Sequence, residues 1–188
     1  MITNHPSEAT LFAHAAGTLP SPHRTVVRTH LAMCPTCGAH ANLAAEAHGA
    51  MLLSEGPAAM SSGALDRVLS QLDLQDAERK PAKVPTTVEA FATGRWLWLG
   101  PGIRLMPLTS RDRQDARLDL IRVSPGARMP THGHTGDELT CVLKGAFDDK
   151  TGSYGVGDIA EGDTTVEHRP SAIGEEDCIC LIATRGRT

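Results

Sequence analysis

A histidine and two cysteines stand close together in the pattern H-x3-C-x2-C, as His30, Cys34 and Cys37. On a continuous helix these positions are i, i+4 and i+7, which lie on one face. Pro35 favours the start of a new helix between the cysteines, so the ligands are expected where one helix ends and the next begins. One imidazole and two thiolates supply three of the four ligands of a tetrahedral zinc ion, so this stretch predicts a zinc site.

The fourth ligand of this site is left open by spacing alone. His5 lies near the start of the chain, just before the first predicted helix. His23 competes with it, because it lies seven residues before His30 on the same helical face. A thioredoxin-like redox pair is the alternative reading of Cys34 and Cys37. That motif follows a strand of a βαβ unit, and no such strand is expected here.

Three imidazoles and a carboxylate form a second group, which consists of His132, His134, Glu138 and His168. His132 and His134 are two residues apart, so on a strand both side chains point to the same face. Glu138 follows after a turn, and His168 is expected on another strand. This donor set suits a first-row divalent metal such as zinc, iron, manganese, nickel or copper.

Two cysteines near the end of the chain, Cys178 and Cys180, alternate with Ile179. Both thiols are therefore expected on one face of a strand. Oxidants attack thiolates and imidazoles readily, which makes this pair a candidate redox sensor. The alternative is that both are simply small buried hydrophobic side chains. The chain has five cysteines, an odd number, which favours metal ligation over disulfides in a reducing compartment.

Helices must position the first group of ligands. Apolar residues at three- and four-residue spacing predict four helices, over residues 7–17, 21–34, 35–55 and 60–73. The fourth has an apolar face that serves either a core or a partner protein. This face consists of Leu65, Val68, Leu69 and Leu72.

The second group must be positioned by strands. Residues 77–87 are polar and contain two prolines, which indicates a linker. Beyond it, short strand-like segments alternate with turn signals, as in a β-sandwich or barrel. The predicted fold class is therefore a multidomain α+β chain. A small zinc-bound helical bundle at residues 1–76 precedes an all-β domain at residues 88–188.

Composition excludes several function classes. The net charge is −4 and only 3% of the residues are aromatic, which gives no reason to expect direct DNA or RNA binding. No secretory signal is visible in the first residues, and no apolar stretch is long enough to span a bilayer. The protein is therefore expected in the cytoplasm and not in a membrane.

Both groups fall within recognisable family motifs. Residues 126–145 read G-x5-H-x-H-x3-E-x6-G, which resembles the first cupin motif, and His168 resembles the histidine of the second. This resemblance implies a jelly-roll barrel with the metal inside. A histidine near the start followed by H-x3-C-x2-C resembles the zinc-binding anti-sigma domain. Together the two halves resemble the ChrR-type anti-sigma factors over nearly the whole chain.

This resemblance implies a set of site residues and a partner. The N-terminal zinc ligands would be His5, His30, Cys34 and Cys37, and the cupin ligands would be His132, His134, Glu138 and His168. The partner would be an extracytoplasmic-function sigma factor, bound one-to-one by the N-terminal domain and held inactive. The cupin would sense singlet oxygen or organic hydroperoxides, with Cys178 and Cys180 as possible redox-sensing residues, and so release the sigma factor.

Two other functions compete with this one. The first is a cupin metalloenzyme, an oxygenase or isomerase, with an accessory zinc domain. Four protein ligands satisfy zinc completely, whereas iron in the same ligand set keeps open positions and can activate oxygen. The second is a cupin that binds a small molecule and controls its partner through ligand occupancy.

Overall fold

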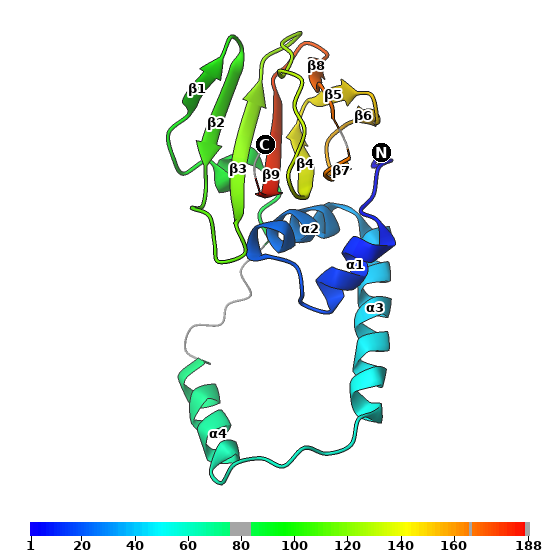
Figure 1. The fold of residues 1–188 in the computed structure, drawn as a ribbon, viewed down its shortest axis with the longest axis vertical. Helices are drawn as coiled ribbons and strands as arrows, with labels where there is room; N and C mark the ends of the chain where they lie inside the picture. The colour runs from blue at the N-terminus through cyan, green and yellow to red at the C-terminus, as the bar shows by residue number, and fades with distance from the viewer. Residues whose placement is uncertain (76–83, 166, 187–188) are drawn as a thin grey trace.

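The computed structural model describes residues 1–75, 84–165 and 167–186. Helices come first and strands follow, as predicted (Figure 1). The helices are α1 (Glu8–Ala15), α2 (Ser21–Met33), α3 (Pro35–Ser54), α4 (Ala64–Gln75) and the short α5 (Val88–Phe91). The predicted α+β class with an N-terminal helical part is therefore confirmed.

Local sequence signals account for the helix boundaries. The Ser7 side chain accepts a hydrogen bond from the Thr10 amide and caps the start of α1. Pro22 and Pro35 occupy the first turns of α2 and α3, where a missing amide proton costs nothing. Between α2 and α3, Cys34 has an extended backbone with φ −117° and ψ 96°. The chain thus bends between the two cysteines, as Pro35 predicts.

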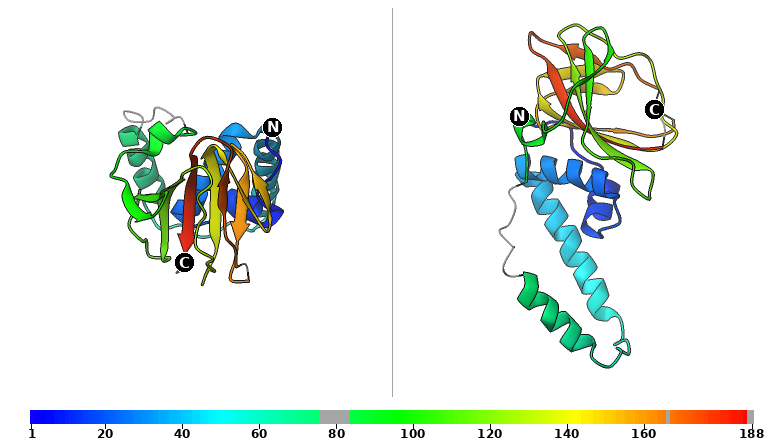
Figure 2. Two further views of the ribbon diagram at one scale, coloured as in Figure 1. Left: turned by 90° about the horizontal axis from the view of Figure 1, so that it is seen from above. Right: turned by 90° about the vertical axis from the view of Figure 1, so that its left-hand side faces the viewer.

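In the part of the chain that the structure describes, nine strands form two antiparallel sheets that face each other (Figures 1 and 2). The larger sheet has the order β1-β2-β3-β9-β4-β7, and the smaller has the order β6-β5-β8. This is the sandwich expected of a cupin jelly roll. The strands are β1 (Leu97–Gly100), β2 (Ile103–Pro107), β3 (Ala116–Val123), β4 (Glu138–Lys144), β5 (Ala146–Asp149), β6 (Gly152–Tyr154), β7 (Ile159–Gly162), β8 (Ser171–Ile173) and β9 (Cys178–Arg185).

The central strands of the larger sheet are buried on both faces. On β9, Leu181 and Ala183 face helix α2, whereas Cys180 faces the space between the sheets. This double burial explains why most of β9 is continuously apolar and does not alternate with polar residues.

Helix α2 lies across the outer face of the larger sheet, against β3, β4 and β9. Val26 and Val27 have no exposed surface and share a core cluster with Leu120 and Leu181 of the sheet. The N-terminal helices and the cupin are therefore built around one common core. Most of the predicted linker at residues 77–87 lies outside the described residues.

Helices α3 and α4 project away from the sheets, as the right-hand view of Figure 2 shows. The apolar face of α4 stays in contact with solvent: Leu65 is 65% exposed and Leu69 is 48% exposed. The sequence left two roles open for this face, packing in a core or binding a partner protein. In the structure the face does not pack in a core. None of the described helices is long and apolar enough to cross a membrane.

Two candidate metal sites

The first site brings together His5, His30, Cys34 and Cys37, whose ligand atoms all lie within 4.8 Å of one another. The Nδ1 atom of His5 is 3.5 Å from the Cys34 sulfur and 3.3 Å from the Cys37 sulfur. A tetrahedral zinc ion with ordinary Zn–N and Zn–S bonds separates its ligand atoms by roughly 3.3–3.8 Å. The two separations between His5 and the cysteine sulfurs therefore match those that zinc requires.

His30 is prepared for metal binding by its surroundings. The ring is fully buried, and its Nδ1 lies 2.7 Å from the carbonyl oxygen of Gly157, to which it donates. The proton on Nδ1 leaves a bare lone pair on Nε2, and this buried atom has no hydrogen-bond partner among the described residues. Burial lowers the pKa of His30, so the imidazole is neutral, as a zinc ligand must be.

The two thiols complete this site. Cys34 and Cys37 are both buried, and burial together with Cys34 raises the pKa of Cys37 to about 11. A nearby cation would favour the thiolate form of Cys37 in this environment. The surroundings of the cysteines therefore suit a bound metal better than a free redox pair.

His23, the competing fourth ligand, lies elsewhere. It is buried, and its Nε2 is 3.0 Å from the carboxylate of Asp137, just before β4. Burial lowers the pKa of His23, while Asp137 acts in the opposite direction. The structure therefore brings His5, and not His23, next to His30, Cys34 and Cys37, whereas His23 links α2 to the cupin.

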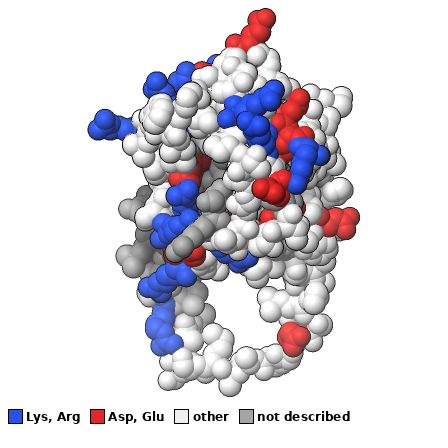
Figure 3. All heavy atoms as spheres, turned by 45° about the horizontal axis from the view of Figure 1, so that its top comes forward, with Lys and Arg blue, Asp and Glu red and all other residues white. Residues whose placement is uncertain are grey.

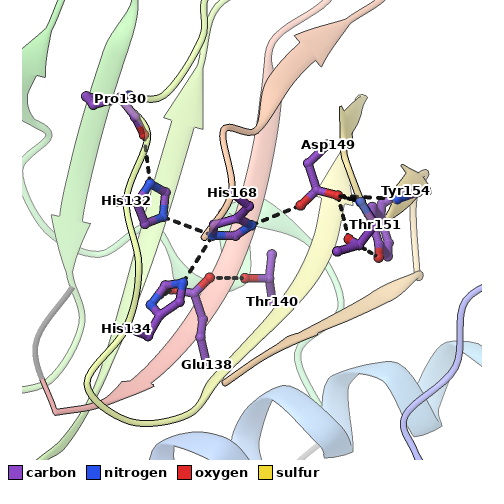
Figure 4. A network of polar contacts seen from close by, with 10 residues as sticks. Pro130, His132, His134, Glu138, Thr140, Asp149, Thr151, Tyr154 and His168 are labelled. Atoms are coloured by element: carbon purple, nitrogen blue, oxygen red, sulfur yellow. Dashed lines mark hydrogen bonds and ion pairs between the residues drawn. The ribbon is translucent and has the colours of Figure 1, made fainter. Parts of the chain in front are cut away.

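The second site lies between the two sheets and is shown in Figure 4. The Nε2 atom of His168 is 3.0 Å from Nε2 of His132 and 3.1 Å from Nε2 of His134. Three imidazole nitrogens thus converge on one point. His132 and His168 are also backbone partners, because each accepts the other's amide proton. This pairing explains how histidines 36 residues apart in sequence meet.

Hydrogen bonds orient two of these rings. Nδ1 of His132 donates to the carbonyl oxygen of Pro130 at 2.8 Å, and Nδ1 of His168 lies 2.9 Å from the carboxylate of Asp149. Each contact fixes the proton on Nδ1 and turns Nε2 towards the shared point. Asp149 is a functional residue that the sequence interpretation missed, since it stands 19 residues away from His168 on β5.

Glu138 lies beside the histidines but not at their meeting point. Its Oε2 is 3.8 Å from Nδ1 of His134, and its Oε1 accepts from the Thr140 hydroxyl at 3.3 Å. Burial raises the pKa of Glu138 to about 7, because the carboxylate has lost its water. A divalent cation would stabilise that buried charge. Its role as the fourth ligand stays a prediction.

The electrostatics of His134 agree with metal binding. Burial lowers its pKa to about 4, and the neighbouring His168 and His132 act in the same direction. A ring with this pKa is neutral near pH 7 and keeps its lone pair for a metal. The donor set of three imidazoles with a nearby carboxylate fits a first-row divalent ion.

A cavity of about 220 Å³ adjoins the second site. Most of its wall is apolar, and Cys178 and Cys180 belong to that wall together with His132 and His168. The cysteine sulfurs lie 3.6 Å apart. The pKa of Cys180 is raised, most strongly by the Cys178 thiol and then by burial and by nearby carboxyl and thiol groups. The face of β9 that bears both thiols is therefore the face of the metal site, a point the sequence left open.

Comparisons with known proteins agree with both halves of the chain. The family described as ChrR Cupin-like domain matches residues 85–186, and the family described as Putative zinc-finger matches residues 8–38. The anti-sigma-E factor ChrR of Cereibacter sphaeroides is 39% identical over 193 residues, which cover 97% of this chain and 90% of that protein.

A solved structure extends the likeness to three dimensions. It is the crystal structure of Rhodobacter sphaeroides SigE in complex with the anti-sigma ChrR. The match has a TM-score of 0.81 at 40% identity and covers 98% of this chain and 99% of that one. Sequence, fold and the two His-rich clusters thus agree, and the chain belongs to the ChrR family of anti-sigma factors.

Proposed function

We propose that this protein binds an extracytoplasmic-function sigma factor one-to-one in the cytoplasm and holds it inactive. Family membership supports this proposal, since the solved relative is a complex of an anti-sigma factor with the sigma factor SigE. The observation that carries it furthest is the apolar surface on the projecting helices. The curated relative is an anti-sigma factor and not an enzyme, so the comparisons give the metalloenzyme alternative no support.

This α3–α4 apolar surface consists of large side chains that are about half exposed or more. They are Leu43, Met51, Leu52, Leu53, Met60, Leu65, Val68, Leu69 and Leu72. The loop between the helices, at the bottom of the view in Figure 3, is mostly free of charged side chains. A soluble protein rarely exposes so much apolar surface unless a partner covers it. Amphipathic helices also bind proteins through their apolar faces.

Coexpression of the full chain with each extracytoplasmic-function sigma factor of the source genome tests this proposal. We expect one of them to copurify in a stable one-to-one complex that contains zinc. Added to a transcription assay, the protein should inhibit RNA synthesis from promoters of that sigma factor. If no sigma factor binds the full chain, the regulatory function is excluded and the cupin should be assayed as an enzyme.

Zinc in the N-terminal site would act as a structural cross-link. It would join His5, which precedes α1, to the end of α2 and the start of α3. A metal with four protein ligands has no open position for a substrate, so its contribution is to stabilise the fold. The position of α3, and with it the α3–α4 apolar surface, would then depend on the metal.

The cupin cavity would sense the signal that releases the sigma factor. Its apolar wall favours uncharged oxidants, namely singlet oxygen and organic hydroperoxides. An organic hydroperoxide oxidises a thiol to a sulfenic acid and leaves as the corresponding alcohol. Cys178 and Cys180 lie in the cavity wall, where such a molecule would meet them. A metal held by His132, His134 and His168 would hold the opposite strands of the cavity together.

Variants of the cavity residues test this sensing role. We expect Cys178→Ser and His132→Ala proteins to bind the sigma factor normally but to release it at least several-fold more slowly under photosensitised oxygen or an organic hydroperoxide. Cys141→Ser is the matched control, because Cys141 is equally buried but faces α2 on the other side of the sheet. Unchanged release by both cavity variants would contradict a sensor in this cavity.

A further inference from the structure

The first residues of the chain are hydrogen-bonded to the cupin. The carboxylate of Asp158 accepts hydrogen bonds from the backbone amides of Thr3 and Asn4, at 2.7 and 3.0 Å. The carbonyl oxygen of Asn4 in turn accepts from the amide of Ile159 at 3.1 Å. Residues 2–4 are thus attached to the start of strand β7, and His5 follows immediately.

Asp158 is built into this position. It is buried, and its second oxygen accepts from the Gly155 amide at 2.8 Å. Its charge is therefore balanced by backbone amides, two of which belong to the N-terminal segment. Charge-assisted hydrogen bonds of this kind are the strong ones. Removal of the carboxylate would leave the Thr3 and Asn4 amides without their acceptor.

The neighbouring residue, Gly157, contacts the same metal site from the other side. Its carbonyl oxygen accepts the hydrogen bond from Nδ1 of His30. Gly157 has φ +89°, and a Cβ atom at this position would lie 2.6 Å from the Ile2 side chain. Only glycine fits this close approach. One short stretch of the cupin therefore orients both histidines of the N-terminal site, His30 directly and His5 through the segment before it.

The other end of strand β7 reaches the second metal site. Gly162 pairs with Glu138 of β4. A Cβ atom at Gly162 would lie 3.6 Å from the ring of His134 and 3.7 Å from Cβ of Glu138. The strand Ile159–Gly162 is four residues long, or roughly 13 Å at ordinary strand spacing. The strand thus joins Asp158, which holds the N-terminal segment, to Gly162, which lies beside His134 and Glu138.

We propose that Asp158 is a positioning residue of the N-terminal metal site and that β7 couples this site to the cupin site. A change in the packing of His134 and Glu138 displaces β7, and Asp158 moves with it. The N-terminal segment is then released, and His5 moves away from His30, Cys34 and Cys37. The signal that starts this movement rests on the proposed sensing function, whereas the coupling between the two sites does not require a sigma factor.

The first test measures metal loss from the N-terminal site of the full chain. The readout is the rate at which Cys34 and Cys37 are alkylated in the presence of a chelator, followed by peptide mass spectrometry. We expect Asp158→Ala to increase this rate by about tenfold to a hundredfold, the usual effect of removing a hydrogen bond that orients a metal ligand. Asp177→Ala is the control, since Asp177 pairs with Arg122 and does not contact the N-terminal segment. Equal rates in Asp158→Ala and the unmodified protein would overturn the proposal.

A second pair of variants leaves the cupin untouched. Thr3→Pro removes the amide that donates to Asp158, whereas Thr3→Ala keeps that amide and removes only the hydroxyl. We expect faster alkylation in Thr3→Pro and little change in Thr3→Ala. Both substitutions lie at an exposed position, so the fold is preserved. Equal rates in the two variants would show that the backbone hydrogen bond does not hold the site.

Coupling between the sites is tested by a double-mutant comparison. We expect His134→Ala to accelerate alkylation of Cys34 and Cys37 in the otherwise unmodified chain but not in the Thr3→Pro background, because the link is already broken there. Independent sites would give additive effects, and additivity would overturn the coupling. None of these three tests involves the sigma factor, so failure here is distinguishable from failure of the proposed function.

Discussion

Replacement of His30 by alanine is expected to disorder the N-terminal metal site and abolish sigma-factor binding together. His30 has no exposed surface and is one of the four side chains that could hold a metal ion in this site. Structural zinc in small zinc-finger domains contributes an apparent binding free energy of about 10–16 kcal/mol, which is comparable to the stability of a whole domain, about 5–15 kcal/mol. Loss of one ligand therefore removes enough stabilisation for α3 to detach from α2.

Three measurements check this expectation. The zinc content of the purified variant should fall by about one equivalent, its helical circular dichroism should decrease, and the sigma factor should no longer copurify. His40→Ala is the control, since His40 is an exposed residue of α3 outside the metal site. A His30→Ala protein that stays folded and still binds the sigma factor would remove zinc from the explanation of binding.

Introduction of a charge on the apolar face of α4 is expected to abolish binding without unfolding the protein. Leu69 is 48% exposed, so a Leu69→Glu side chain remains in water when the protein is free. In a complex that covers this face, the carboxylate would be desolvated without a partner. Central apolar contacts of an interface contribute 2 kcal/mol or more, so we expect affinity to fall by at least roughly thirtyfold.

Ser70→Glu provides the matched control for this prediction. Ser70 neighbours Leu69 in sequence, but its side chain lies on the opposite side of α4 from the apolar face. Both variants should melt at the same temperature as the unmodified protein, while only Leu69→Glu loses the sigma factor in a titration. If the two variants bind equally well, the partner does not cover α4.

The sequence by itself determined the helices and most of the metal-site residues. The H-x3-C-x2-C spacing places His30, Cys34 and Cys37 within two turns of chain, and Pro35 sets the bend between the helices. The spacing of His132 and His134 likewise follows from the two-residue period of extended chain. These are local properties. The geometry of a short stretch of backbone is enough to bring such side chains to the same face of a helix or strand.

Only the tertiary structure decided the remaining points. It placed His5 in the first site and turned His23 to Asp137 of the cupin, and it directed Cys178 and Cys180 into the cavity. It also left the apolar face of α4 exposed and joined the N-terminal segment to Asp158, 155 residues away from Thr3. Each of these outcomes depends on contacts between distant segments. Such contacts arise because the helices pack on a sheet that is buried on both faces. The spacing of residues along the chain does not reveal how these elements pack against one another.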